Sequence, residues 1–260
     1  MTGVAAPRFA PAPSQSRLFA IELRKTVDTR AGFWLLVSSA LAAIAVAAVT
    51  LAAGDHHHEP TLGLFFARTV GVGSIALPVL GVLAITSEWS QRTALTTFAL
   101  VPRRARVIAA KLLAGVAVAL VAVAVCLLTS LAATALVPVL TDGPARWDLA
   151  ASAVAAAVPF MTLWMLAGSA LGLLVMSSAP AVALSFIIPT GIVGLTTAIP
   201  SADHVLRWID LGTTMGELDS ARPAISAQDW AHIATGVLVW VVVPLALGFL
   251  RLRRRELTAA

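Results

Sequence analysis

The stretch EWSQRTALTTFALVPRRARVIAAK, residues 88–111, is a polar and basic segment between two long apolar runs. It holds four arginines and one lysine, in a chain of 260 residues that is 59% hydrophobic and only 12% charged. Soluble domains carry about 25% charged residues. The composition therefore excludes an ordinary soluble domain, and the position of the segment between apolar runs predicts a loop at a membrane surface.

Six apolar runs around this loop are long enough to cross a bilayer, because a hydrocarbon core of about 30 Å needs about 20 helical residues. They cover residues 33–53, 63–86, 112–137, 150–177, 179–199 and 231–250. Only the sequence SSAP separates the fourth run from the fifth, which favours a tight turn between antiparallel helices. The sequence therefore predicts an all-α, polytopic membrane protein. We expect residues 1–13 to be a flexible cytoplasmic tail and residues 14–260 to be one six-span domain.

The lysines and arginines predict the orientation of these spans. If both termini are cytoplasmic, fourteen of the eighteen basic residues lie on the cytoplasmic side: Arg8, Arg17, Arg24, Lys25, Arg30, Arg92, Arg103, Arg104, Arg106, Lys111, Arg251, Arg253, Arg254 and Arg255. The outer side keeps Arg68, Arg146, Arg207 and Arg222. Cytoplasmic loops of membrane proteins are enriched in Lys and Arg. We therefore expect cytoplasmic N- and C-termini in a bacterial cell membrane, with residues 88–111 facing the cytoplasm.

Catalytic and cofactor signatures are missing from the sequence. It contains no H-E-x-x-H motif and no phosphate-binding loop, and the single cysteine, Cys126, cannot form an intramolecular disulfide. The run DHHHE, Asp55 to Glu59, carries possible metal ligands, but adjacent histidines in one short loop converge poorly on an ion, which favours a solvated loop. The basic residues flank apolar runs, so nucleic acid is not expected as a partner. We expect no catalytic residue, cofactor or metal in this chain.

A helix is expected over residues 15–31, immediately before the first span. Phe19, Leu23 and Val27 lie at four-residue spacing on one face, and the other side carries Glu22, Arg24, Lys25 and Asp28. Such a helix can lie in the headgroup layer, with its apolar face toward the acyl chains and its basic residues near lipid phosphates. The alternative is a simple continuation of the first span.

The basic loop itself has a pattern. Glu88 and Arg92 are four residues apart, which suits a helical ion pair. The apolar stretch TALTTFAL, residues 93–100, follows, and Pro102 interrupts it. Arg103, Arg104 and Arg106 then precede Lys111, where the third span is expected to begin. Plain anchoring of the loop by positive charge accounts for the arginines but not for the short helix before the proline.

This series of residues resembles the permease subunits of type-2 ATP-binding-cassette (ABC) exporters. The resemblance rests on Glu88, the Arg92-Thr93 pair, Leu95, Pro102 and the arginines before Lys111, and on the stretch ELRKTVDTR, residues 22–30, before the first span. The family commonly has Gly before the Thr, where this chain has Gln91-Arg92. The resemblance implies that the helix carrying Phe19, Leu23, Lys25 and Val27 is an elbow helix. It also implies that the loop docks on a separate ATPase subunit through Glu88, Arg92, Thr93, Leu95, Phe98, Pro102, Arg103 and Arg106.

The outer loop, residues 200–230, is the longest polar segment. Ser201 is expected to cap a short helix carrying Val205, Trp208 and Ile209, and Ser226 with Asp229 resembles a capping box. The resemblance implies short outer helices that close the exit; the alternative is a surface loop anchored by Trp208 and Trp230.

The function expected from these patterns is export of a lipophilic or amphiphilic substrate. The partners would be an ATPase subunit that binds ATP and Mg, a second permease copy or paralogue, and membrane lipids. Two alternatives stay open. One is a non-transporting membrane assembly or sensor module. The other is an ion-coupled secondary transporter, which the absence of Asp, Glu, Lys and His from the middle of the spans disfavours.

Overall fold

The structure is a computed structural model that describes residues 13–53, 61–90, 104–141, 143–199, 201, 203–206, 208–210, 212 and 227–257. Within this part of the chain the fold is all-α. Its elements are α1 (Gln15–Asp28), α2 (Arg30–Ala53), α3 (Leu62–Gly73), the 3₁₀ turn η1 (Ser74–Ala76), α4 (Leu77–Ser90), α6 (Arg104–Leu140), α7 (Ala151–Val175), α8 (Ser178–Ala198), α9 (Asp203–Leu206), α11 (Ala227–Val237), the π-helical turn η3 (Leu238–Val242) and α12 (Val243–Leu257).

Six helices are long and apolar enough to cross a membrane, as the sequence predicts. They are Arg30–Ala52, Leu62–Glu88, Arg104–Leu140, Ala151–Val175, Ser178–Ala198 and Trp230–Arg254. The protein is therefore a multi-pass membrane protein. The third helix begins at Arg104 and not at residue 112, so the arginines of the basic loop that follow Pro102 are in part helical.

Two spans contain a local change of helix type beside a proline. Pro78 has no N–H to donate to the carbonyl of Ser74, which instead accepts from the N–H of Leu77, and this tighter turn is η1. In the last span, η3 ends at Val242, two residues before Pro244. Prolines are tolerated at such points because the neighbouring backbone groups find other partners.

The core lies between α4 and α7, whose backbones approach closely. A Cβ added to Gly168 would clash with the carbonyl of Pro78, and one added to Gly81 would clash with the carbonyl of Met165. A Cβ added to Gly172 would lie 3.1 Å from the Cα of Val82. The GSALG sequence of residues 168–172 is therefore used for packing within the chain, where small residues let helices approach.

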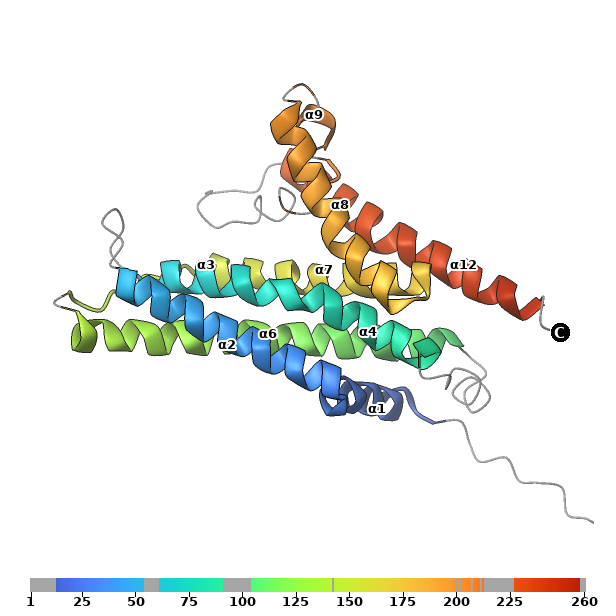
Figure 1. The fold of residues 1–260 in the computed structure, drawn as a ribbon, viewed down its shortest axis with the longest axis horizontal. Coiled ribbons are helices and arrows are strands. Elements are labelled where there is room, and N and C mark those ends of the chain that lie inside the picture. The colour runs from blue at the N-terminus through green and yellow to red at the C-terminus, as the bar shows by residue number, and fades with distance from the viewer. Residues whose placement is uncertain are drawn as a thin grey trace, which may run out of the picture.

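Helices α2, α3, α4, α6 and α7 run along the long axis of the molecule, whereas α8 and α12 diverge from them (Figure 1). Only two residues separate α7 from α8, and Met176 takes a left-handed conformation there, with φ 57°. The N-terminal half of α8 packs on its neighbours through Ala181 and Ser185. At the far end of the bundle, the N–H of Leu62 donates to the carbonyl of Arg146, which joins the start of α3 to the segment before α7.

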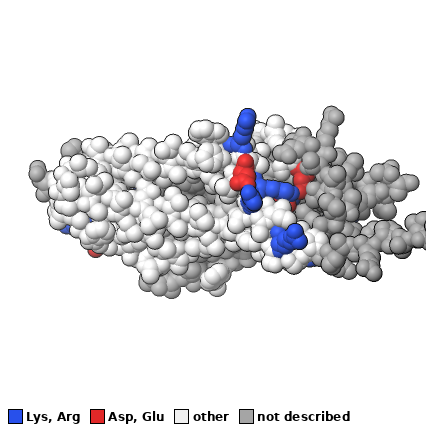
Figure 2. Space-filling view, turned by 90° about the horizontal axis from the view of Figure 1, so that it is seen from below, with Lys and Arg blue, Asp and Glu red and all other residues white. Residues whose placement is uncertain are grey.

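The start of α6, helix α1 and the C-terminal end of α12 lie at the same end of the molecule (Figure 1). Charged side chains gather near this end on the face shown in Figure 2, where the rest of the described surface is mostly uncharged.

Candidate functional site

Helix α1 lies beside the start of α6, at the end of the bundle where the charges gather. Its first turn is capped by the Ser14 hydroxyl, which accepts from the N–H of Arg17 at 3.3 Å. The side chain of Leu18 packs on Val107 and Ala110 of α6. Arg106 donates to the carbonyl of Pro13 at 2.6 Å, and Gln15 Nε2 donates to the carbonyl of Arg106 at 3.0 Å. Helix α1 is therefore fixed to α6 at its first turn.

The face of α1 that is buried against the protein differs from the apolar face predicted from the sequence. Leu18, Glu22 and Thr26 are buried, whereas Phe19 and Leu23 are only half-buried and Val27 is exposed. The prediction placed Glu22 on the polar side of the helix, away from the apolar side. Glu22 points inward because its carboxylate forms an ion pair with a lysine of another helix.

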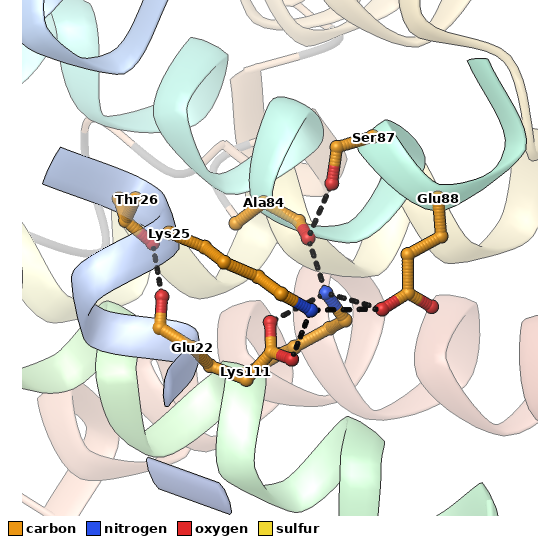
Figure 3. A network of polar contacts seen from close by, with 7 residues as sticks. All are labelled: Glu22, Lys25, Thr26, Ala84, Ser87, Glu88 and Lys111. Atoms are coloured by element: carbon orange, nitrogen blue, oxygen red, sulfur yellow. Dashed lines mark hydrogen bonds and ion pairs between the residues drawn. The ribbon is translucent and has the colours of Figure 1, made fainter. Parts of the chain in front are cut away.

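That lysine is Lys111 of α6, whose side chain is 4% exposed. Its Nζ lies 2.7 Å from Glu22 Oε2 and 3.3 Å from Oε1 of Glu88, the acidic residue near the end of α4. It also donates to the carbonyl of Ala84 at 3.0 Å (Figure 3). One ammonium group therefore connects α1, α4 and α6.

Lys25 contacts the same carboxylates from the solvent-exposed side of α1. Its Nζ donates to Glu22 Oε1 at 2.9 Å and lies 3.6 Å from Glu88 Oε1 (Figure 3). Burial lowers the pKa of Lys25, but the hydrogen bond and charge of Glu22, together with the charge of Glu88, outweigh this and raise the pKa above its ordinary value. Lys25 is therefore held as a cation. We call Glu22, Lys25, Glu88 and Lys111 the charge network.

The charge network balances two carboxylates against two ammonium groups. A buried ion pair adds little net stability because both ions lose their hydration, but removal of one partner leaves an uncompensated buried charge. The four residues therefore fix the relative positions of three helices more than they stabilise the fold. They hold the ends of α4 and α6 and the middle of α1 in one arrangement.

A cavity of about 270 Å³ lies beside the charge network. Residues of α1, of the turn into α2 and of α4 form its walls: Glu22, Lys25, Thr26, Thr29, Ala31, Gly32, Leu80, Leu83, Ala84, Ser87 and Glu88. One side of the cavity is therefore polar and the other is apolar.

The structure brings two of the expected site residues into contact, Lys25 of α1 and Glu88 of α4. It places a third, Arg106, against the first turn of α1. The others, Arg92, Thr93, Leu95, Phe98, Pro102 and Arg103, lie outside the described residues. Sequence reasoning missed Glu22 and Lys111 as partners. One signal was present: Lys111, one of only two lysines in the chain, directly precedes the third apolar run.

A smaller polar group lies between α9 and the last span, where α8 and the last span diverge from the bundle (Figure 1). The ring of Trp208 meets the imidazole of His232 edge to face at 4.1 Å between centroids, and Trp240 Nε1 donates to the carbonyl of Ile209 at 2.6 Å. Val205 is exposed and the adjacent helix is only Asp203–Leu206. These contacts hold part of the outer loop on the last span. Ser226 lies outside the described residues, as do Asp55 to Glu59.

Among the described residues, no group of three His, Cys, Asp or Glu side chains is arranged to hold a metal ion. Cys126 is a buried free thiol that packs against Thr69. Comparison of the chain with known protein families, curated proteins and solved structures found no match.

Proposed function

We propose that this protein is the membrane-spanning permease subunit of an ABC exporter, in the cell membrane of a bacterium. The proposal begins from the resemblance of residues 22–30 and 88–111 to type-2 exporter permeases. It requires that movement of the loop between α4 and α6 be passed to the spans. A separate ATPase subunit would bind ATP and Mg and would dock on that loop.

The observation that carries the proposal is the position of the charge network. Glu88 lies at the end of α4, immediately before residues 91–103, and Lys111 lies in the second turn of α6, shortly after them. Glu88 and Lys111 form an ion pair, and each also contacts α1. These contacts connect the helix before the loop to the helix after it. A displacement of the loop would therefore move α4, α6 and α1 together.

The chemistry of the spans supports a lipophilic or amphiphilic substrate. The exposed surfaces of α2 and α8 are apolar, with Ile44, Val49, Ile187 and Val193 about half exposed or more. A path formed between this chain and a second permease copy would be lined by such side chains. In the described spans, the Asp, Glu, Lys, Arg and His side chains lie toward the helix ends, which is unsuited to an ion relay.

The proposed orientation puts the N- and C-termini in the cytoplasm. Six spans place both termini on one side, and α1 and the end of α12 lie at the same end of the molecule (Figure 1). Most basic residues of the described helices lie at this end, which favours the cytoplasm.

The docking of the loop tests this function directly. The neighbouring genes would first be searched for a P-loop ATPase. That subunit would be reconstituted with the chain in proteoliposomes, and ATP hydrolysis and export of a lipophilic dye would be measured. Leu95→Ala and Phe98→Ala should weaken ATPase binding or separate hydrolysis from export, because loss of a buried apolar anchor costs about 2 kcal/mol or more.

Arg103→Gln is the control for this test, because neighbouring arginines still mark the cytoplasmic side. It should leave export close to that of the unmodified protein. If the two apolar substitutions leave both partner binding and export unchanged, the loop only anchors the chain, and a non-transporting membrane module becomes the better interpretation. ATP hydrolysis by the purified chain alone would also contradict the proposal.

A further inference from the structure

The last span changes helix type near its middle. At the end of η3 the N–H of Val243 donates to the carbonyl of Leu238, five residues back instead of the usual four. Pro244 follows and has no N–H to donate. The hydrogen-bond ladder of this span is therefore interrupted at two successive residues. Sharp bends in helices usually lie at prolines or π-helical turns, and such turns are frequent at functional sites.

The part of the span after η3, helix α12, is fixed on α7. A Cβ added to Gly248 would lie 2.8 Å from backbone atoms of Leu173 and Leu174, so the two backbones are in close contact. Arg251 donates to the carbonyl of Leu174 at 2.7 Å, and Leu252 is buried in a cluster that includes Leu173. The turn η3 also packs on α7. Helix α12 and η3 therefore form one unit with α7.

The part of the span before η3, helix α11, is held differently. It has no comparable contact with another described span. It contacts the outer loop, where the imidazole of His232 meets the ring of Trp208. Trp240, inside η3, donates through Nε1 to the carbonyl of Ile209 at 2.6 Å. Two successive residues of the loop therefore connect α11 to η3, across the interrupted part of the helix.

We propose that η3 is a hinge in the last span, and that the hydrogen bond from Trp240 to Ile209 is the latch that keeps it in the arrangement of this structure. When the latch breaks, α12 stays on α7, and α11 swings together with the loop residues that contact it. A helix rises 1.5 Å per residue, so Gln228 lies about 18 Å from Trp240, and a change of about 20° in the bend moves it by about 6 Å. The hinge does not depend on whether the chain exports a substrate.

The test measures distances between two spin labels by electron paramagnetic resonance, in the full chain reconstituted in phospholipid nanodiscs. In a background lacking Cys126, Leu120→Cys on α6 carries the first label of two pairs. The second label is at Gln228→Cys before η3 or at Arg253→Cys after it, and all three positions are exposed. Gln228 and Arg253 lie at nearly equal distances from Trp240 along the sequence.

The pair with Gln228 should show a main distance and a minor component displaced by about 6 Å, whereas the pair with Arg253 should show one distance. Trp240→Phe keeps an aromatic ring but removes the N–H of the latch. Loss of a hydrogen bond between neutral groups should raise the displaced fraction about fivefold in the Gln228 pair and leave the Arg253 pair unchanged. A substitution that alters neither pair, or both pairs equally, would overturn the proposal.

Trp164→Phe is the matched control, because the indole N–H of Trp164 in α7 has no hydrogen-bond partner in the described part of the chain. It should leave both pairs unchanged, and an effect equal to that of Trp240→Phe would contradict the latch.

Pro244→Ala tests the hinge itself, because it supplies a backbone N–H that can donate to the carbonyl of Trp240. Added to Trp240→Phe, it should reduce the displaced fraction of the Gln228 pair. Pro189→Ala makes the same change within α8, where the helix type does not change, and should have no effect on this pair. Equal effects of the two proline substitutions would show that η3 is not the point of bending.

Discussion

Lys111 is the residue on which the charge network depends most, because its ammonium group contacts both carboxylates and a backbone carbonyl. Lys111→Met keeps most of the side-chain volume but leaves Glu22 and Glu88 with only the half-exposed Lys25. Removal of one partner from a buried ion pair typically costs about 3–5 kcal/mol. We therefore expect a large fall in the unfolding temperature of the purified protein in detergent.

Arg24→Met is the matched control for this substitution. Arg24 pairs with Asp28 on the exposed side of α1 at 2.9 Å, and both side chains are more than half exposed. Exposed pairs at this spacing contribute about 0.3–0.5 kcal/mol, so the unfolding temperature should hardly change. Adding Glu22→Gln to Lys111→Met should cost less than the sum of the two single substitutions, because the second change removes a carboxylate that the first left unpaired. Strict additivity would show that the two side chains are not coupled.

Lys25 gives the network a dependence on alkaline pH. Its pKa is raised above the ordinary value of 10.5 in the folded protein, so its contribution to stability is complete below pH 10.5 and is lost as the pH rises through the folded pKa. The chain has no tyrosine, which simplifies titration in this range. The unfolding temperature of the unmodified protein should therefore fall more steeply above pH 10.5 than that of Lys25→Gln. Parallel curves for the two proteins would contradict this role.

At the scale of helices, the close contact of α4 and α7 leads to a prediction about glycine. Gly168→Ala places a methyl group against the backbone of Pro78, and Gly81→Ala places one against the carbonyl of Met165. Each should force the two helices apart and destabilise the protein by about 1–3 kcal/mol, the usual cost of overpacking. Thermal unfolding in detergent measures the effect.

Gly191→Ala is the control for these substitutions, because nothing lies within 4 Å of a Cβ added there. Alanine has the higher helix propensity, so the substitution should be neutral or slightly stabilising. Equal losses at Gly168 and Gly191 would mean that helix propensity, and not contact between α4 and α7, decides the outcome.

The helices differ in how far the sequence predicts them. The six spans follow from the length of their apolar runs, because the bilayer fixes the length of a helix before any packing is considered. The inward face of α1 does not follow from its own periodicity. Glu22 is turned inward by Lys111, which is remote in the sequence, and spacing within one helix carries no information about such a partner. The early start of α6 was missed for a related reason: the contacts of its first turn are with α1, where the guanidinium of Arg106 donates to the carbonyl of Pro13 and Gln15 donates to the carbonyl of Arg106.

At the scale of the whole molecule, the spans fall into a well-packed group and an exposed group. In the most apolar windows of the second and fourth spans 56% of the residues are buried, compared with 17% in the first span and 11% in the fifth. The fifth span is α8, which diverges from the bundle with much of its apolar surface uncovered (Figure 1). Lipid or a second copy of the chain must cover these surfaces, since apolar side chains are unstable in water. The proposed pairing of two permease subunits is consistent with this distribution.

The orientation of the molecule is tested by introduced cysteines. In the described part of the chain, most lysines and arginines lie in α1, in the first turns of α2 and α6 and at the end of α12, which predicts that this side is cytoplasmic. In a background lacking Cys126, Asp55→Cys, Asp142→Cys and Glu217→Cys should react in intact cells with a thiol reagent that cannot cross membranes. Arg104→Cys should react only after the cells are opened. Labelling of Arg104→Cys in intact cells, with protection of Glu217→Cys, would invert the molecule, and an ATPase in the cytoplasm could then no longer reach the loop between α4 and α6.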